Sequence, residues 1–111
     1  MDLNKIMNWT ILVIAGLFEI AWAVGMKYSN GFTKLYPSLF VVITMGISVY
    51  LLSVSLKTLP VGSAYAIWTG IGAVGTAILG MILFGESKEL IRLGFIFLII
   101  TGIAGLRIFS N

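Results

Sequence analysis

The sequence of 111 residues contains no cysteine and no histidine, and only 10% of its residues are charged. Without cysteine there are no disulfides and no thiol chemistry, and without both residue types the usual transition-metal ligands are missing. Soluble domains carry about 25% charged residues. With 59% hydrophobic residues and a mean hydropathy of +1.10, the chain is predicted to be an all-α integral membrane protein.

The few charged residues mark the connections between long apolar runs. These runs predict four transmembrane helices with very short loops, at residues 9–27, 36–56, 61–84 and 90–108, because about 20 apolar residues cross a bilayer. Barrel strands would be shorter and would alternate in polarity. The helices leave no room for a soluble domain, so one four-helix domain over residues 1–111 is expected. The net charge of +3 comes from loop lysines and arginines, and neither a nucleic-acid partner nor a cofactor is expected.

Glu19 is a lone carboxylate inside the first apolar run. It is the only charged residue between Lys5 and Lys27. The apolar run that contains it extends from Trp9 to Met26. That length spans the hydrocarbon core, so Glu19 is predicted to lie near the midplane. An ionisable group at this depth is costly to bury and indicates a functional site.

A different interpretation of the first run is a secretory signal. Residues 21–23, Ala-Trp-Ala, resemble a signal-peptidase site behind an apolar stretch that follows Lys5. The stretch is long for a signal peptide, and cleavage there would remove Glu19. The membrane-helix interpretation is therefore preferred.

The balance of basic residues leaves the orientation in the membrane ambiguous. Four spans place both termini on one side, with Lys5, Lys57 and Arg107 there and Lys27, Lys34, Lys88 and Arg92 opposite. Three against four is almost no bias for the positive-inside rule to act on. Either this small bias or the lipid context fixes the topology, or the chain inserts both ways and the two orientations can pair.

Trp22 lies three residues after Glu19 on the same helical face, and Gly16, three residues before it, is predicted to form a small notch that lines the site beside the carboxylate. The indole can donate its N–H to the carboxylate or offer its ring to a cation. A single membrane tryptophan is otherwise an interfacial anchor or a packing residue, but Trp22 is deep for an anchor. Ser48, midway along the second helix, can also bond to Glu19, although serine often bonds its own helix backbone.

The third predicted helix carries four residues at the i, i+3, i+4, i+7 spacing of one face, namely Tyr65, Trp68, Thr69 and Gly72. This arrangement indicates either a polar site lining or an aromatic packing stripe. Gly70 and Gly72 weaken the middle of the helix and predict a hinge, although glycine is also common where membrane helices pack closely.

The fourth helix offers a face of small residues, which allow close approach of another helix. They are Gly94, Thr101, Gly102 and Gly105. Four helices are too few for the two inverted repeats that many transporters use around a midplane site. Two copies in opposite orientation would supply that symmetry, so this face is a predicted dimer interface, with packing inside one chain as the alternative.

Glu19 has no evident cationic partner in the sequence, since Lys27 is expected to reach the membrane interface. Such a carboxylate can be neutral when it holds a proton and negative when it holds a cation. This is the logic of proton and cation exchange at one site.

These residues resemble the small multidrug resistance transporters over nearly the whole chain. The matching segments are Gly16-Leu17-Phe18-Glu19-Ile20-Ala21-Trp22-Ala23, Met26-Lys27-Tyr28-Ser29, Gly31-Phe32-Thr33, Pro60-Val61-Gly62 and Ala64-Tyr65-Ala66-Ile67-Trp68-Thr69-Gly70-Ile71-Gly72. Trp22, Lys57 and the Gly-Ile-Gly-Ala at 70–73 look like the guanidinium-exporter subtype. The first six residues look like an extension, and Arg107 stands where that subtype often has lysine.

The resemblance implies a proton-coupled antiporter of the bacterial inner membrane rather than an enzyme. It also implies an antiparallel, dual-topology homodimer that holds both Glu19 residues in one central site, lined by Trp22, Ser48, Tyr65 and Trp68. The implied substrate is guanidinium or a small guanidinyl cation. Export of hydrophobic quaternary ammonium ions is the alternative within transport, and a regulatory membrane subunit or a channel is the alternative outside it.

Overall fold

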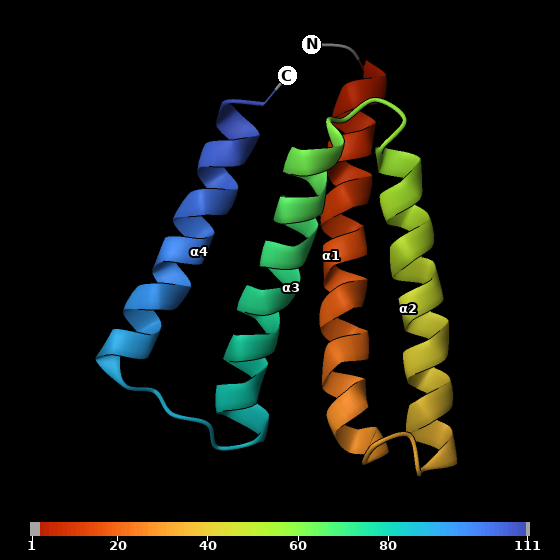
Figure 1. The fold of residues 1–111 in the computed structure, drawn as a ribbon, viewed down its shortest axis with the longest axis vertical. Helices are drawn as coiled ribbons and strands as arrows, with labels where there is room; N and C mark the ends of the chain where they lie inside the picture. The colour runs from red at the N-terminus through yellow and green to blue at the C-terminus, as the bar shows by residue number, and fades with distance from the viewer. Residues whose placement is uncertain (1–2, 111) are drawn as a thin grey trace.

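Four helices make up most of residues 3–110, the part of the chain that this computed structural model describes (Figure 1). They are α1 (Leu3–Ser29), α2 (Leu35–Ser55), α3 (Val61–Leu83) and α4 (Leu90–Ile108). No strand occurs in this range. Each helix is long and apolar enough to cross a membrane. The prediction of four membrane helices is therefore confirmed.

The helix ends follow local backbone chemistry. α1 starts at Leu3, six residues before the predicted span, because a helix can continue past the apolar segment that hydropathy detects. The other helices start and end within one residue of the predicted positions.

After α1, Asn30, Gly31 and Phe32 adopt positive φ angles of 49°, 73° and 65° and turn the chain toward α2. Ser29 supports this turn by accepting a hydrogen bond from the Phe32 N–H at 3.1 Å.

α1 is the central helix of the protomer. It packs against α2 and α3, whereas α4 packs against α3 and stands apart from the other two (Figure 1). The core lies in the half of the bundle that contains the start of α1, the end of α2 and the start of α3. Its buried members are Trp9, Leu12, Ala15, Leu52, Leu59, Ala64, Ile67 and Trp68. α4 buries only Ile96, so most of its surface is open to lipid or another chain.

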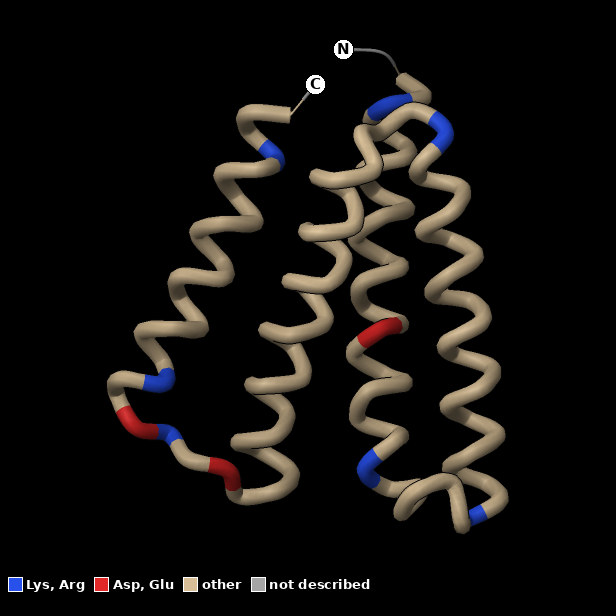
Figure 2. The backbone as a smooth tube through the Cα atoms, viewed as in Figure 1, with Lys and Arg blue, Asp and Glu red and all other residues tan. Residues whose placement is uncertain are grey.

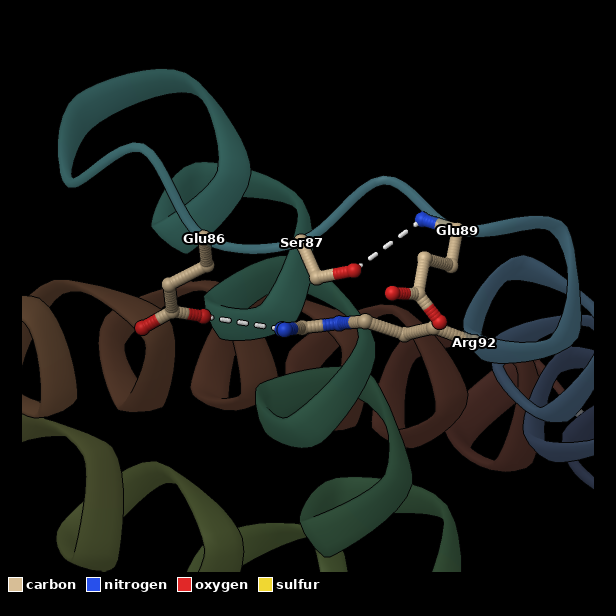
Figure 3. Close-up of polar contacts among 4 residues, drawn as sticks. All are labelled: Glu86, Ser87, Glu89 and Arg92. Atoms are coloured by element: carbon tan, nitrogen blue, oxygen red, sulfur yellow. Dashed lines mark hydrogen bonds and ion pairs between the residues drawn. The ribbon is translucent and has the colours of Figure 1, made fainter.

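The charged residues gather at the two ends of the bundle, apart from one acidic position midway along α1 (Figure 2), which is Glu19. At one end the α3–α4 connection is held by an ion pair between Arg92 Nη2 and Glu86 Oε1 at 2.8 Å (Figure 3). In the same connection the Glu89 N–H donates to Ser87 Oγ at 3.2 Å. Because the paired side chains are 32% and 45% exposed, the pair contributes at most about 1 kcal/mol and serves mainly to shape the loop.

Candidate functional site around Glu19

The Glu19 side chain lies between α1 and α3, directly on the backbone of Gly72. A Cβ added at Gly72 would lie 2.7 Å from Glu19 Cγ and still closer to the carboxyl carbon and oxygen. Real Cβ atoms are essentially never found under 3.0 Å from another heavy atom. Only glycine at position 72 therefore allows the carboxyl group to lie here.

Glu19 and Trp22 each keep an unused hydrogen-bonding atom. Glu19 Oε1 and Trp22 Nε1 are both buried, and neither has a hydrogen-bond partner within the described residues. The predicted bond between indole and carboxylate is absent from this conformation. A buried polar atom without a partner costs about 1–3 kcal/mol. In this conformation the Glu19 oxygen is free to accept a hydrogen bond, and the Trp22 N–H is free to donate one, within the described residues.

Ser48 links the three helices beside Glu19 without bonding to it. The Trp68 Nε1–H donates to Ser48 Oγ at 3.0 Å, and the Ser48 hydroxyl donates to the Ala15 carbonyl at 2.7 Å. Ser48 is fully buried. In an α-helix the Ala15 carbonyl also accepts from the N–H of Glu19, four residues later. The network therefore fixes the helical turn of α1 that carries Glu19. Ser48 acts on the site indirectly, through the position of this turn.

Replacing Ser48 with Ala should destabilise the protein by about 1–3 kcal/mol, because the buried Trp68 N–H loses its acceptor. The measurement is the free energy of unfolding in mixed micelles, titrated with a denaturing detergent. Ser53→Ala is the matched control, because Ser53 is exposed on the same helix and its hydroxyl donates only to the carbonyl of Tyr50 in that helix. An equal decrease in the free energy of unfolding in the two variants would show that the hydrogen-bond network of Ser48 does not stabilise the protein.

The other predicted lining residues are placed differently. The Tyr65 ring lies 5.5 Å from the Trp68 ring, tilted by 56°, and Tyr65 is 56% exposed at the edge of the site. Gly16 is buried, and a Cβ there would lie 2.7 Å from Ile71 Cγ2. Ile71 therefore fills the notch predicted beside Glu19. Trp68 and Ser48 are brought together at the site, and Tyr65 faces outward from this protomer.

The two glycines predicted as a hinge lie at close helix contacts. α3 is continuous through both positions. A Cβ at Gly70 would lie 2.9 Å from Ile103 of α4, and Gly72 receives Glu19 of α1. Both glycines thus allow close packing in this conformation, and bending at them stays a prediction.

The small-residue face of α4 has no packing partner within the described chain. A Cβ at Gly94, Gly102 or Gly105 would meet no atom within 4 Å. Thr101 is exposed and bonds back to the Phe97 carbonyl at 2.9 Å. Packing inside one chain therefore does not explain why these residues are small.

Sequence reasoning missed Thr76, whose hydroxyl is buried and unpartnered in the described chain. It lies one turn beyond Gly72 and lines a cleft of about 360 Å³ together with Lys27, Glu86 and Arg92. The i+4 spacing from Gly72 was the available signal, because it continues the face of Trp68 and Gly72.

Four apolar helices, one of which carries a half-buried glutamate midway along its length, define a multi-pass membrane protein with an ionisable group within its spans. A family model described as Small Multidrug Resistance protein matches residues 7–99. The chain belongs to this family, which confirms the resemblance found in the sequence. With its four apolar helices, the protein is a multi-pass protein of the bacterial inner membrane.

Curated relatives cover nearly the whole chain. A protein of Yersinia pseudotuberculosis named guanidinium exporter is 57% identical over 104 residues, which are 94% of this chain and all of the relative. Guanidinium exporters of Escherichia coli strain K12 and Salmonella typhimurium are 56% and 58% identical over 105 residues, which are 95% of this chain and all of each relative.

Proposed function

We propose that the protein is a transporter, not an enzyme, and that it exports guanidinium or small guanidinyl cations in exchange for protons at Glu19. The observation that carries the proposal is a carboxyl group midway along a membrane helix, whose buried Oε1 has no hydrogen-bond partner among the described residues. The names of the relatives, at 56–58% identity, support guanidinium as the substrate.

The substrate chemistry matches the free groups of the site. Guanidinium is planar, keeps its charge at physiological pH and presents paired N–H donors to a carboxylate. The same carboxylate can bind a proton instead, and within one protomer no second anionic group lies in the four spans. Proton and cation therefore compete for Glu19, and competition at one site couples their movements.

We further propose that two protomers associate in opposite orientations around a shared site. The unpartnered glycine face of α4 supports a helix contact between copies. The exposed position of Tyr65 supports a role for this side chain in lining a space between the two protomers. In such a dimer both Glu19 side chains can grip one flat ion, with Trp22, Ser48, Tyr65 and Trp68 around it.

Both orientations are expected to occur in one membrane, because basic residues are nearly balanced between the two ends. A tag on the C-terminus should be reached by an impermeant reagent from both faces of intact vesicles. Adding lysines to the connections at one end should fix the orientation and lower activity when no oppositely oriented partner is present. Labelling from one face alone would contradict dual topology.

The substrate class is tested with purified protein in liposomes. An imposed proton gradient should drive uptake of radiolabelled guanidinium and should not drive uptake of tetraphenylphosphonium. The reverse preference would favour export of hydrophobic quaternary cations. Failure of the purified protein to exchange either ion would favour a regulatory subunit.

A further inference from the structure

We propose that Gly72 is a positioning residue that provides a seat in the α1–α3 interface for the protonated carboxyl group of Glu19. The inference rests on the proposed function and extends it. Proton binding favours the carboxyl group in the seat, and cation binding draws the carboxylate out of it. Gly72 would thereby link the protonation of Glu19 to its position.

The seat is one of three similar contacts along the interface of α1 with α3. Ile71 lies on Gly16, Glu19 lies on Gly72, and Ile20 lies on Gly75. In the first and third contacts an apolar side chain fills the space above a glycine. In the second contact a carboxyl group takes that place, so Glu19 is packed as if it were an apolar residue.

Packing of this kind suits the neutral form of a carboxyl group. The Oε1 atom of Glu19 accepts no hydrogen bond within the described residues. Burying a charged oxygen without a donor or a cation is far more costly than burying a neutral carboxyl group. A proton on Glu19 therefore stabilises the observed position, whereas a charged carboxylate gains by turning toward a cation.

No charged group of the neighbouring helices compensates Glu19 in this position. Along α1 the nearest charged residues are Lys5 and Lys27 near its ends, and α2 and α3 contain no charged residue. The arginines of α4, Arg92 and Arg107, lie near its ends. The titratable phenols are Tyr28 at the end of α1, Tyr36 and Tyr50 on α2 and Tyr65 on α3, and all four are exposed.

The test replaces Gly72 with Ala and follows the protonated carboxyl band of Glu19 by infrared difference spectroscopy, with Glu19→Gln as the blank. The added methyl group removes the seat, so the protonated form should lose about tenfold in stability relative to the charged form, a typical overpacking effect. The band should then appear about one pH unit lower than in wild type. Acid should inhibit guanidinium binding at a correspondingly lower pH.

Two further variants separate the seat from general damage to the interface. Gly75→Ala adds the same methyl group against Ile20, an apolar neighbour, and should leave the carboxyl titration unchanged. In the Glu19→Asp background the shorter side chain leaves room for the added methyl group. Gly72→Ala should therefore change the stability of the protonated form, relative to the charged form, by less than about twofold. An equal shift in Gly75→Ala, or an undiminished shift in the Glu19→Asp background, would overturn the proposal.

The readouts also separate this proposal from the proposed function. If guanidinium exchange is coupled to protons and the Gly72→Ala carboxyl group titrates as in wild type, the seat is wrong and the function stands. If no guanidinium exchange occurs in wild type, the function is wrong, and the infrared titration still decides the seat because it needs no substrate.

Discussion

Replacing Glu19 with Gln will abolish proton-coupled transport while the protein still folds. Glutamine has nearly the same shape and can lie on Gly72, but it neither carries a negative charge nor exchanges a proton. Each hydrogen bond to a charged group contributes about 1.5–3 kcal/mol, so losing the paired bonds to a cation should weaken binding by more than about a hundredfold. The side chain is the only ionisable carboxyl group in the four spans, and nothing else there can replace it.

The measurement for Glu19→Gln is radiolabelled guanidinium uptake driven by a proton gradient, with thermal unfolding in detergent as the check on folding. Glu86→Gln is the matched control, because Glu86 is a carboxylate outside the spans that pairs with Arg92. The control should keep coupled uptake. Proton-driven guanidinium exchange that persists in Glu19→Gln would remove Glu19 from the mechanism.

Replacing Trp22 with Gly is expected to weaken guanidinium binding by about ten- to a hundredfold and to admit bulky cations. The Trp22 N–H is buried and has no acceptor, Glu19 included, among residues 3–110, so it remains available when the carboxylate turns toward a cation. Losing a bond from this donor to a charged group costs about 1.5–3 kcal/mol. Losing the ring is also expected to widen the space beside Glu19, where we propose that Trp22 lines the site.

Guanidinium affinity and tetraphenylphosphonium uptake are measured together in Trp22→Gly and in Trp22→Phe. The phenylalanine variant keeps an aromatic wall without the donor, so it should bind guanidinium weakly and still exclude the bulky ion. If both properties are unchanged in Trp22→Gly, the residue serves only in packing and the physical basis for small-cation selectivity is lost.

The sequence was sufficient to predict the four helices and the central carboxylate. Long uncharged runs define membrane helices because a bilayer tolerates little else, and Glu19 is conspicuous because charge is so rare in the spans. The start of α1 at Leu3 was not predicted, since a helix can extend into the polar interface where hydropathy carries no signal.

The contacts around Glu19 could be predicted only in part. Trp68 and Ser48 were expected at the site, but the bond from Ser48 to the Ala15 carbonyl depends on how α1 and α2 are rotated against each other. Membrane helices are apolar on all faces, so the pattern that marks the inner face of a soluble helix is weak here. For the same reason Gly72 suggested a hinge in the sequence, whereas the structure reveals its contact with the carboxyl group.

The most direct test of the central claim is reciprocal coupling in proteoliposomes that contain only this protein. An outward guanidinium gradient is imposed without a pH gradient, and internal pH is followed with an entrapped dye. In wild type, guanidinium efflux is expected to drive proton entry and acidify the lumen, with no acidification in Glu19→Gln. Guanidinium efflux without proton entry, or equal acidification in both proteins, would contradict exchange at a shared Glu19 site.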